Sequence, residues 1–322
     1  MTTSPEQVAW FSESFQKMVA NVELAVVGKT HAVRLALTSL LTGGHLLLED
    51  VPGTGKTMLA KAIANTVQGD NHRIQFTPDL LPSDVVGGTV YDQSTGTFEL
   101  RKGPVFATVV LADEINRASP KTQSALLEVM EEGHVTIDGT THPIGPPFMV
   151  IATQNPIEQA GTYRLPEAQL DRFLIRTSLG YPDEESTVRV LRESSSRDRS
   201  TAVGPLITTD AVVDMIALAG GVYADDSILA YVSQIATATR QDPDVRLGVS
   251  LRGCLALTRA ARTWAAAAGR HYVLPDDVKE LVPAVLSHRI LLDPEAEFAG
   301  ATVANVISRV LAAVPPPVGA AA

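Results

Sequence analysis

A glycine-rich loop that ends in a lysine and a threonine carries the most specific chemistry in the sequence. The loop is Asp50-Val51-Pro52-Gly53-Thr54-Gly55-Lys56-Thr57, and a helical pattern follows it from Met58 to Val67. Small glycines let successive backbone N–H groups turn toward phosphate oxygens, and the start of the following helix adds a positive dipole. We expect Lys56 to reach the β- and γ-phosphates and the Thr57 hydroxyl to bind Mg²⁺. The alternative is a glycine-rich turn that caps an ordinary helix.

Asp50 stands where the general phosphate-loop pattern has its first glycine. Aspartate tolerates unusual backbone angles better than most residues, so the loop can still form. Its negative charge must then point away from the phosphates. The predicted nucleotide-binding residues of this loop are Pro52, Gly53, Thr54, Gly55, Lys56, Thr57 and Met58.

Two carboxylates follow a second apolar run, Val109 to Ala112. We expect Asp113 to hold Mg²⁺ through its water shell, and Glu114 to orient and polarise the attacking water. Phosphoryl transfer depends mainly on such positioning and charge stabilisation. Taken alone, an Asp-Glu pair at a strand end is also typical of a solvated loop. Together with the phosphate loop, the pair predicts nucleotide hydrolysis.

Three further polar residues are candidates for contacts with the γ-phosphate. Asn155, at the tip of a third apolar run, is predicted to sense the state of the nucleotide, although an Asn before a proline also favours a simple turn. Arg172 is expected to end a helix at the domain edge and to reach the nucleotide of a neighbouring subunit, with Arg176 in reserve. A surface pair between Asp171 and Arg172 is the alternative.

Arg252 lies in the first turn of a helix that Ser250 is expected to cap. A positive charge there opposes the helix dipole by about 0.3 to 1 kcal/mol, so another interaction should hold it. A γ-phosphate across the domain cleft would provide that interaction. Arg259, two turns further along, has the character of a solvated side chain.

Two sequence patterns must position these residues. Short apolar runs alternate with helical patterns up to about residue 180, which predicts a parallel sheet with crossover helices. The strands expected are His45–Leu48, Arg73–Phe76, Thr108–Ala112, Phe148–Ala152 and Leu174–Leu179. Helical patterns rich in Ala and Leu fill the rest. We therefore predict an α/β domain over residues 1–180 and an all-α domain over 181–322, with hairpin inserts near 87–103 and 133–147. The hairpins suit substrate contact or a passive surface role.

Composition narrows the possible classes of function. The 322 residues carry a net charge of −10 and only 5% aromatic side chains, which argues against bulk nucleic-acid binding and base stacking. The single cysteine, Cys254, cannot form an internal disulfide. We find no leader-like N-terminus and no uncharged run long enough to span a bilayer. We therefore expect a soluble, cytoplasmic protein.

In combination, four motifs closely resemble those of the MoxR family of AAA+ ATPases. The motifs are Arg73–Leu80, Leu111–Ala118, Ala152–Pro156 and Leu165–Phe173, and the resemblance extends from Val26 to Ile290. The resemblance implies a doubly wound ATPase core with a helical lid, ATP and Mg²⁺ bound between subunits, and rings that are usually hexamers. It also implies chaperone-like action on protein clients, often with a partner that carries a von Willebrand factor A domain.

The same resemblance assigns roles to individual residues. Asn155, Arg172 and Arg252 correspond to sensor 1, the arginine finger and sensor 2, and Val27 and Gly28 lie where the adenine would pack. The hairpins resemble the helix-2 insert and the pre-sensor-1 hairpin. Leu251 replaces the usual proline before the sensor-2 arginine. Two other functions stay open, the ATPase subunit of a metal chelatase and a nucleic-acid motor.

Overall fold

The computed structural model describes residues 3–51, 53–155, 163, 165–192 and 199–317. The chain forms two compact units. The α/β unit comprises Lys17–Phe173 and Thr177–Val213, and the helical unit comprises Met1–Gln16, Leu174–Arg176 and Asp214–Ala322. The division falls within α1 (Pro5–Glu23), β9 (Ile175–Thr177) and α8 (Thr209–Gly220).

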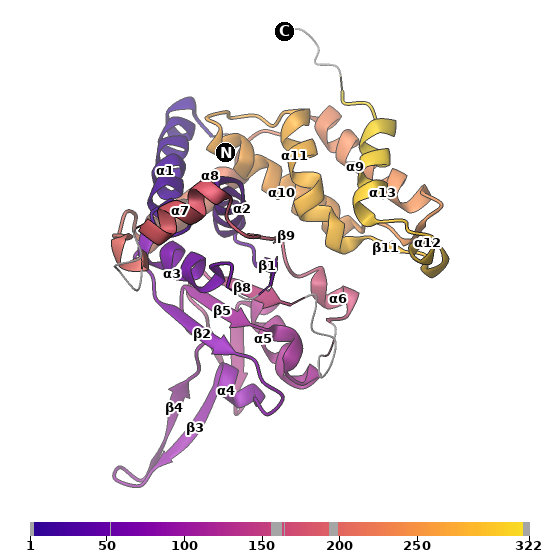
Figure 1. Cartoon of the computed structure of the whole chain (residues 1–322). Helices are drawn as coiled ribbons and strands as arrows, with labels where there is room; N and C mark the ends of the chain where they lie inside the picture. Colours follow the sequence, from indigo (N-terminus) through magenta and orange to yellow (C-terminus); the bar gives the residue numbers. More distant parts are fainter. Residues whose placement is uncertain (1–2, 52, 156–162, 164, 193–198, 318–322) are drawn as a thin grey trace. The chain divides into compact units, whose positions relative to one another are not determined.

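A five-stranded sheet lies at the centre of the α/β unit, in the order β2-β5-β8-β1-β9 (Figure 1). Its first four strands are β2 (Asn71–Gln75), β5 (Val109–Asp113), β8 (Met149–Gln154) and β1 (Leu46–Glu49), and β9 completes it. Neighbours among these four strands pair in parallel. Because each of these five strands overlaps a segment predicted as a strand, the predicted α/β fold is confirmed.

Both faces of the sheet are covered, which explains why β1, β5 and β8 are mostly apolar and buried along their length, whereas β2 is polar and mostly exposed. On one face, Val110 and Val150 share a buried cluster with Leu126 and Leu127 of α5 (Pro120–Glu132). Burying each such leucine contributes about 1.5–3 kcal/mol. On the other face, α3 (Lys56–Thr66) packs against β5.

The register of the strands brings their polar ends together. Gln75 pairs with Asp113 at the ends of β2 and β5, and Glu49 pairs with Gln154 at the ends of β1 and β8. In doubly wound sheets, ligands bind at this carboxyl edge. The residues predicted to do chemistry follow these same strand ends.

His45 joins three elements of the α/β unit. Its Nδ1 accepts a hydrogen bond from the Val150 N–H at 3.0 Å, and its Nε2 bonds to the Met130 carbonyl oxygen at 3.0 Å. The ring therefore carries its proton on Nε2 and fixes the start of β1 against β8 and α5. Burial disfavours the charged ring and lowers the pKa of His45 to about 4, although the bond to Met130 opposes this shift.

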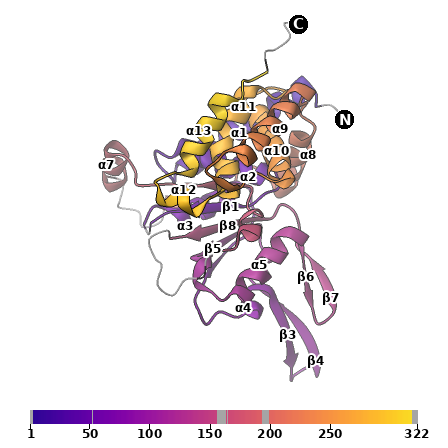
Figure 2. The same cartoon turned by 90° about the vertical axis from the view of Figure 1, so that its right-hand side faces the viewer.

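Two antiparallel hairpins occupy the predicted insert segments. One pairs β3 (Gly87–Asp92) with β4 (Thr97–Lys102), and the other pairs β6 (His134–Ile137) with β7 (Thr140–Pro143). Both leave the α/β unit on the side of α4 and α5 (Figure 2). The remaining helices of this unit are α2 (Thr30–Leu41), α4 (Pro82–Val86), α6 (Glu167–Leu170) and α7 (Glu184–Arg192), with 3₁₀ turns at Ile115–Arg117 and Arg199–Ala202.

The helical unit is built on small side chains. Ala256, Ala260 and Ala261 of α10 (Leu251–Ala267) are buried, and α10 packs on α11 (Pro275–Leu286). Its elements after α8 are α9 (Asp226–Gln241), β10 (Val245–Leu247), α10 (Leu251–Ala267), α11 (Pro275–Leu286), a 3₁₀ turn at Ser287–Arg289, β11 (Leu291–Leu292), α12 (Pro294–Phe298) and α13 (Val303–Ala313). The short β10–β11 pair is an addition to the helices that the sequence predicted.

The packing division differs from the boundary after residue 180 that the sequence pattern indicates. The amides of Leu206 and Ile207 donate to the Thr66 carbonyl oxygen, which fixes the segment before α8 to the α/β unit. At the other end of the chain, the Ser12 hydroxyl donates to the Ala267 carbonyl oxygen within the helical unit. No helix in the described part of the chain is both long and apolar enough to cross a membrane.

Candidate functional site

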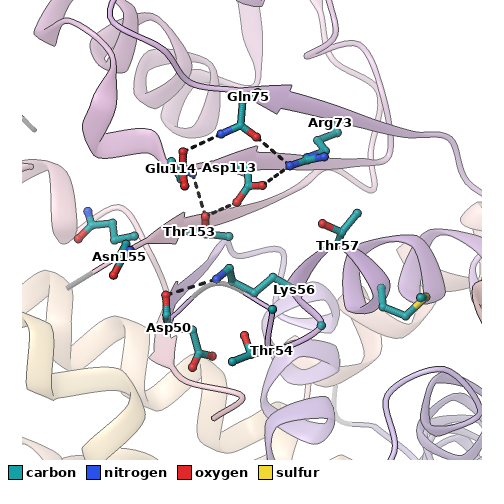
Figure 3. Close-up of a pocket in the computed structure, with 14 residues that line it drawn as sticks. Asp50, Thr54, Lys56, Thr57, Arg73, Gln75, Asp113, Glu114, Thr153 and Asn155 are labelled. Carbon is teal, nitrogen blue, oxygen red and sulfur yellow. Dashed lines mark hydrogen bonds and ion pairs between the residues drawn. The ribbon is translucent and has the colours of Figure 1, made fainter. Parts of the chain in front are cut away.

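A pocket of about 450 Å³ opens at the carboxyl edge of the sheet (Figure 3). Its walls come from the phosphate loop and from the ends of β2, β5 and β8. The lining residues are Asp50, Gly53, Thr54, Gly55, Lys56, Thr57, Met58, Arg73, Gln75, Asp113, Glu114, Thr153, Gln154 and Asn155. The fold thus gathers most of the predicted site residues into one cavity, while Pro52 lies outside the described residues.

The phosphate loop has the backbone that an anion cradle requires. Gly53 and Gly55 have φ angles of +85° and +98°, a left-handed conformation that other residues rarely adopt. Apart from its chain neighbours, no described residue has a heavy atom within 4 Å of the Cβ position of either glycine, so this side of the loop is open. The 11-residue helix α3 begins directly after Gly55 and directs its first N–H groups toward the loop.

Lys56 is held by main-chain carbonyls of its own loop. Its Nζ donates to the Val51 oxygen at 2.9 Å and to the Asp50 oxygen at 3.3 Å. These neutral acceptors leave the ammonium charge without a counter-ion among the bonds described for it. A phosphate would therefore be a stronger acceptor for Lys56 than its present partners.

Asp113 is held by a cation and a hydroxyl. Arg73 Nη2 lies 2.6 Å from Asp113 Oδ2, and the Thr153 hydroxyl donates to Oδ1 at 2.6 Å. The Arg73 side chain is 52% exposed, so water screens this ion pair and leaves it exchangeable. The carboxylate therefore has a fixed orientation and a partner that can be displaced.

Glu114 has an unusual backbone and two side-chain partners. Its φ and ψ angles are 56° and 48°, a left-handed conformation that costs about 1–3 kcal/mol in a residue other than glycine. The Thr153 hydroxyl oxygen accepts its N–H at 2.9 Å. Gln75 Nε2 and Arg117 Nη1 donate to Glu114 Oε2 at 2.8 and 2.9 Å. The protein thus maintains a strained backbone that turns this carboxylate into the pocket.

The oxygen donors of the pocket fit a magnesium ion. Mg²⁺ prefers oxygen ligands and is commonly bound by one or two carboxylates together with substrate phosphates and water. The Thr57 hydroxyl and the Asp113 carboxylate line the same cavity. Among the described residues, no group of three or more His, Cys, Asp or Glu forms a separate metal cage. Thr57 and Asp113 would hold the ion together with the phosphates.

Val27 and Gly28 line a second cavity of about 850 Å³, next to α7. Gly28 has a φ of +72°, and a Cβ there would lie 2.2 Å from Ser186 Oγ. Only glycine therefore fits between the α1–α2 connection and α7. Glu184, Val188 and Arg189 of α7 form the opposite wall.

The predicted arginines lie in different surroundings. Arg172, just after α6, pairs through Nε with Glu131 Oε2 of α5 at 2.7 Å. Arg176 lies on β9. Arg252 is exposed in the first turn of α10, where the Ser250 side chain accepts the Gly253 N–H as predicted. Asn155 lines the pocket, and the roles of Asn155, Arg172 and Arg252 all stay predictions.

The sequence interpretation gave no role to four residues that shape the acidic pair, Asp113 and Glu114. These residues are Arg73, Gln75, Arg117 and Thr153. One signal was present, since Arg73 and Gln75 are two residues apart on one strand and therefore point to the same face. Two polar side chains on one face of a strand that neighbours the strand of Asp113 indicate that they contact the acidic pair.

Comparison with protein-family models defines the class. Residues 45–175 match the ATPase family associated with various cellular activities (AAA), and residues 237–310 match the AAA lid domain. A crystal structure of a candidate ATPase from Cytophaga hutchinsonii superposes with a TM-score of 0.91 and 40% identity, covering 97% of this chain and 98% of that one. The fold and the site therefore define an AAA+ ATPase with a helical lid.

Individual relatives narrow the family. The chain is 49% identical to the uncharacterized protein YeaC of Bacillus subtilis, over 94% of both chains. It is 40% identical to the chaperone MoxR1 of Mycobacterium tuberculosis, over 92% of this chain and 81% of that protein. The chain belongs to the MoxR family of AAA+ ATPases.

Proposed function

We propose that this protein hydrolyses ATP in a Mg²⁺-dependent reaction at the pocket on the carboxyl edge of the sheet, and uses the reaction to remodel client proteins. The observation that carries the proposal is the convergence of four predicted residues on this single cavity. These residues are Lys56, Asp113, Glu114 and Asn155. Family membership supports the same activity.

Each residue of the pocket has a separate role in the proposed reaction. Lys56 moves from two carbonyl oxygens to the β- and γ-phosphates, and Glu114 orients and polarises the attacking water. Gln75 and Arg117 hold the Glu114 carboxylate for that task. When bound, Mg²⁺ neutralises the charge on the phosphate oxygens. Asn155, at the tip of β8, contacts both the γ-phosphate and the water.

Glu114→Gln tests this assignment. The variant should bind ATP with nearly parental affinity, because the amide keeps the shape of the carboxylate. Its turnover should fall at least about 100-fold, since general-base catalysis contributes roughly 10²–10⁴-fold. Release of phosphate measures turnover, and a fluorescent nucleotide measures binding. Glu128→Gln, at an exposed position on α5, is the matched control. Parental turnover in Glu114→Gln would exclude the assigned role.

The proposal includes a ring, expected to be a hexamer, in which Arg172 completes the site of the next copy. Its pairing with Glu131 supports a preorganised guanidinium. Mixing Arg172→Ala with Glu114→Gln tests this arrangement. Each variant alone lacks turnover, but random mixed rings contain intact sites and should recover about a quarter of parental activity. An arginine that acts within its own subunit predicts no recovery.

The client proposal rests on family membership and on the similarity to the chaperone MoxR1. Arg252, in the first turn of α10, would report the γ-phosphate to the lid and so couple hydrolysis to movement. The test uses ATP-bound Glu114→Gln to trap client proteins and then combines the trapped client with the parent protein. The parent should release the client only when it can hydrolyse ATP. A partner with a von Willebrand factor A domain belongs to this proposal, and equal trapping with ADP would contradict it.

A further inference from the structure

Asp50 joins the phosphate loop to a distant part of the α/β unit. The residue is 5% exposed, and its Oδ2 accepts the Leu179 N–H at 2.5 Å. Its Oδ1 accepts the Gly180 N–H at 3.1 Å. Its main-chain oxygen accepts a hydrogen bond from Lys56 at 3.3 Å (Figure 3). One residue thus holds the phosphate-binding lysine with its backbone and the segment after β9 with its carboxylate.

That segment, residues 178–183, connects β9 to α7, and we call it the connector. Lys29 Nζ donates to the Tyr181 carbonyl oxygen at 2.6 Å, on the far side of Gly180. Asp183 Oδ1 accepts the Ser186 N–H at 2.7 Å and so caps the start of α7. The connector is therefore fixed at successive points, the first of which is Asp50. The position of α7 follows from these contacts.

An aspartate at position 50 is explained by its hydrogen bonds to the connector and not by phosphate binding. Binding of phosphate needs only backbone N–H groups at this end of the loop, and the general pattern has glycine there. A glycine would leave the two connector amides without their carboxylate acceptor, and a buried N–H group without an acceptor is unfavourable. The Gly180 N–H is shared by both carboxylate oxygens, since it also lies 3.3 Å from Oδ2. An asparagine would offer one oxygen and would place an N–H₂ donor where the second carboxylate oxygen accepts.

We propose that Asp50 is a positioning residue. It binds the connector to the phosphate loop and so fixes the position of α7, which forms one wall of the second cavity, relative to that loop. A nucleotide would then be bound at its phosphates by the loop and at its other end by the cavity of Val27 and Gly28. This inference rests on the proposed nucleotide site. Preorganisation of the two half-sites gives Asp50 its effect on affinity.

The test compares a ligand that spans both cavities with one that occupies only the loop. Calorimetry with ADP and with inorganic tripolyphosphate, both with Mg²⁺, should show that Asp50→Gly weakens ADP about tenfold while tripolyphosphate changes less than about twofold. Asp50→Asn should fall between parent and Asp50→Gly. Glu49→Gln, the preceding carboxylate, is the control. Equal weakening of both ligands would mean that Asp50 only shapes the loop, and unchanged ADP affinity would also overturn the proposal.

Hydrogen exchange supplies a readout that does not depend on affinity. In the ligand-free protein, Asp50→Gly should speed exchange in residues 178–192 and leave β8 unchanged. Saturating ADP should protect α7 in the parent and much less in the variant. Equal protection of parent and variant would overturn the proposal. Failure of the parent to bind ADP would instead refute the proposed nucleotide site, and the ligand-free comparison would still decide the role of Asp50.

Discussion

Acid should weaken the α/β unit through His45, whose neutral ring is built into the sheet. The folded-state pKa is about 4, against 6.5 for an exposed histidine. Between these values the unfolded chain binds a proton that the folded chain does not. Stability from this residue is therefore complete above pH 6.5 and is lost as the pH falls toward 4.

The size of the effect follows from the shift. One pKa unit corresponds to about 1.4 kcal/mol, so the shift from 6.5 to about 4 corresponds to roughly 3 kcal/mol in all. Between pH 7.5 and pH 5, linkage gives a loss of about 2 kcal/mol. Protonation of Nδ1 would also break the bond from Val150, because a protonated nitrogen cannot accept. The pKa shift and the loss of this hydrogen bond describe the same free energy and are not added together.

His45→Asn isolates this contribution, because asparagine does not titrate and its side-chain oxygen can accept the Val150 N–H. Urea unfolding followed by far-UV circular dichroism, at several pH values from 7.5 to 5, gives the free energy of unfolding for both proteins. The variant should be less stable at pH 7.5, and the difference should shrink by about 2 kcal/mol at pH 5. Other titrating groups cancel in the comparison. A difference that stays constant with pH would refute the reasoning.

Three further substitutions test separate parts of the structure. Arg270→Met should destabilise the helical unit by about 3–5 kcal/mol in thermal unfolding, because Asp277, 4% exposed, would lose its paired cation; replacing Asp277 with Leu as well should restore most of it. Gly28→Ala should weaken ADP binding measured by calorimetry, since the new Cβ would lie 2.2 Å from Ser186 Oγ; unchanged affinity would remove the second cavity from the site. Thr153→Val should lower turnover about 10- to 100-fold with little change in nucleotide affinity, because it removes a hydrogen bond to each residue of the acidic pair; proportional losses in both would point to misfolding instead.

The parts of the fold that were predictable depend on local patterns. A strand covered on both faces must be apolar along its whole length, so runs such as Val109–Ala112 identify the sheet directly. The phosphate loop is equally local, because its glycines, lysine and helix start are contiguous. The hairpin at Gly87–Lys102 follows from alternation around a turn. Each signal lies within a single stretch of sequence.

The parts that were not predictable depend on partners far along the chain. The amide bound by Asp50 lies 129 residues later, so the sequence indicated only that the charge must avoid the phosphates. Arg172 lies next to an acid, Asp171, yet the ion pair described for it is with Glu131 on another helix. Arg73 lies on β2, where Ile74 is the one buried residue, and nothing in the local sequence distinguishes it from a surface arginine. Tertiary packing alone determines these pairs.

Each charged group that a nucleotide would engage already has a partner within the chain. Lys56 bonds to loop carbonyls, Asp113 pairs with Arg73, and Glu114 is held by Gln75. Ligand binding is therefore an exchange of partners and exposes no unpaired charge, which keeps the pocket stable before the ligand arrives. The exchange favours the ligand at Lys56, where a charged phosphate replaces neutral oxygens. At Asp113 the exchange disfavours binding of the metal, because Mg²⁺ must compete with the Arg73 guanidinium for the carboxylate. Phosphate and metal binding should consequently reinforce each other, since phosphates that draw Arg73 away also free the carboxylate for Mg²⁺.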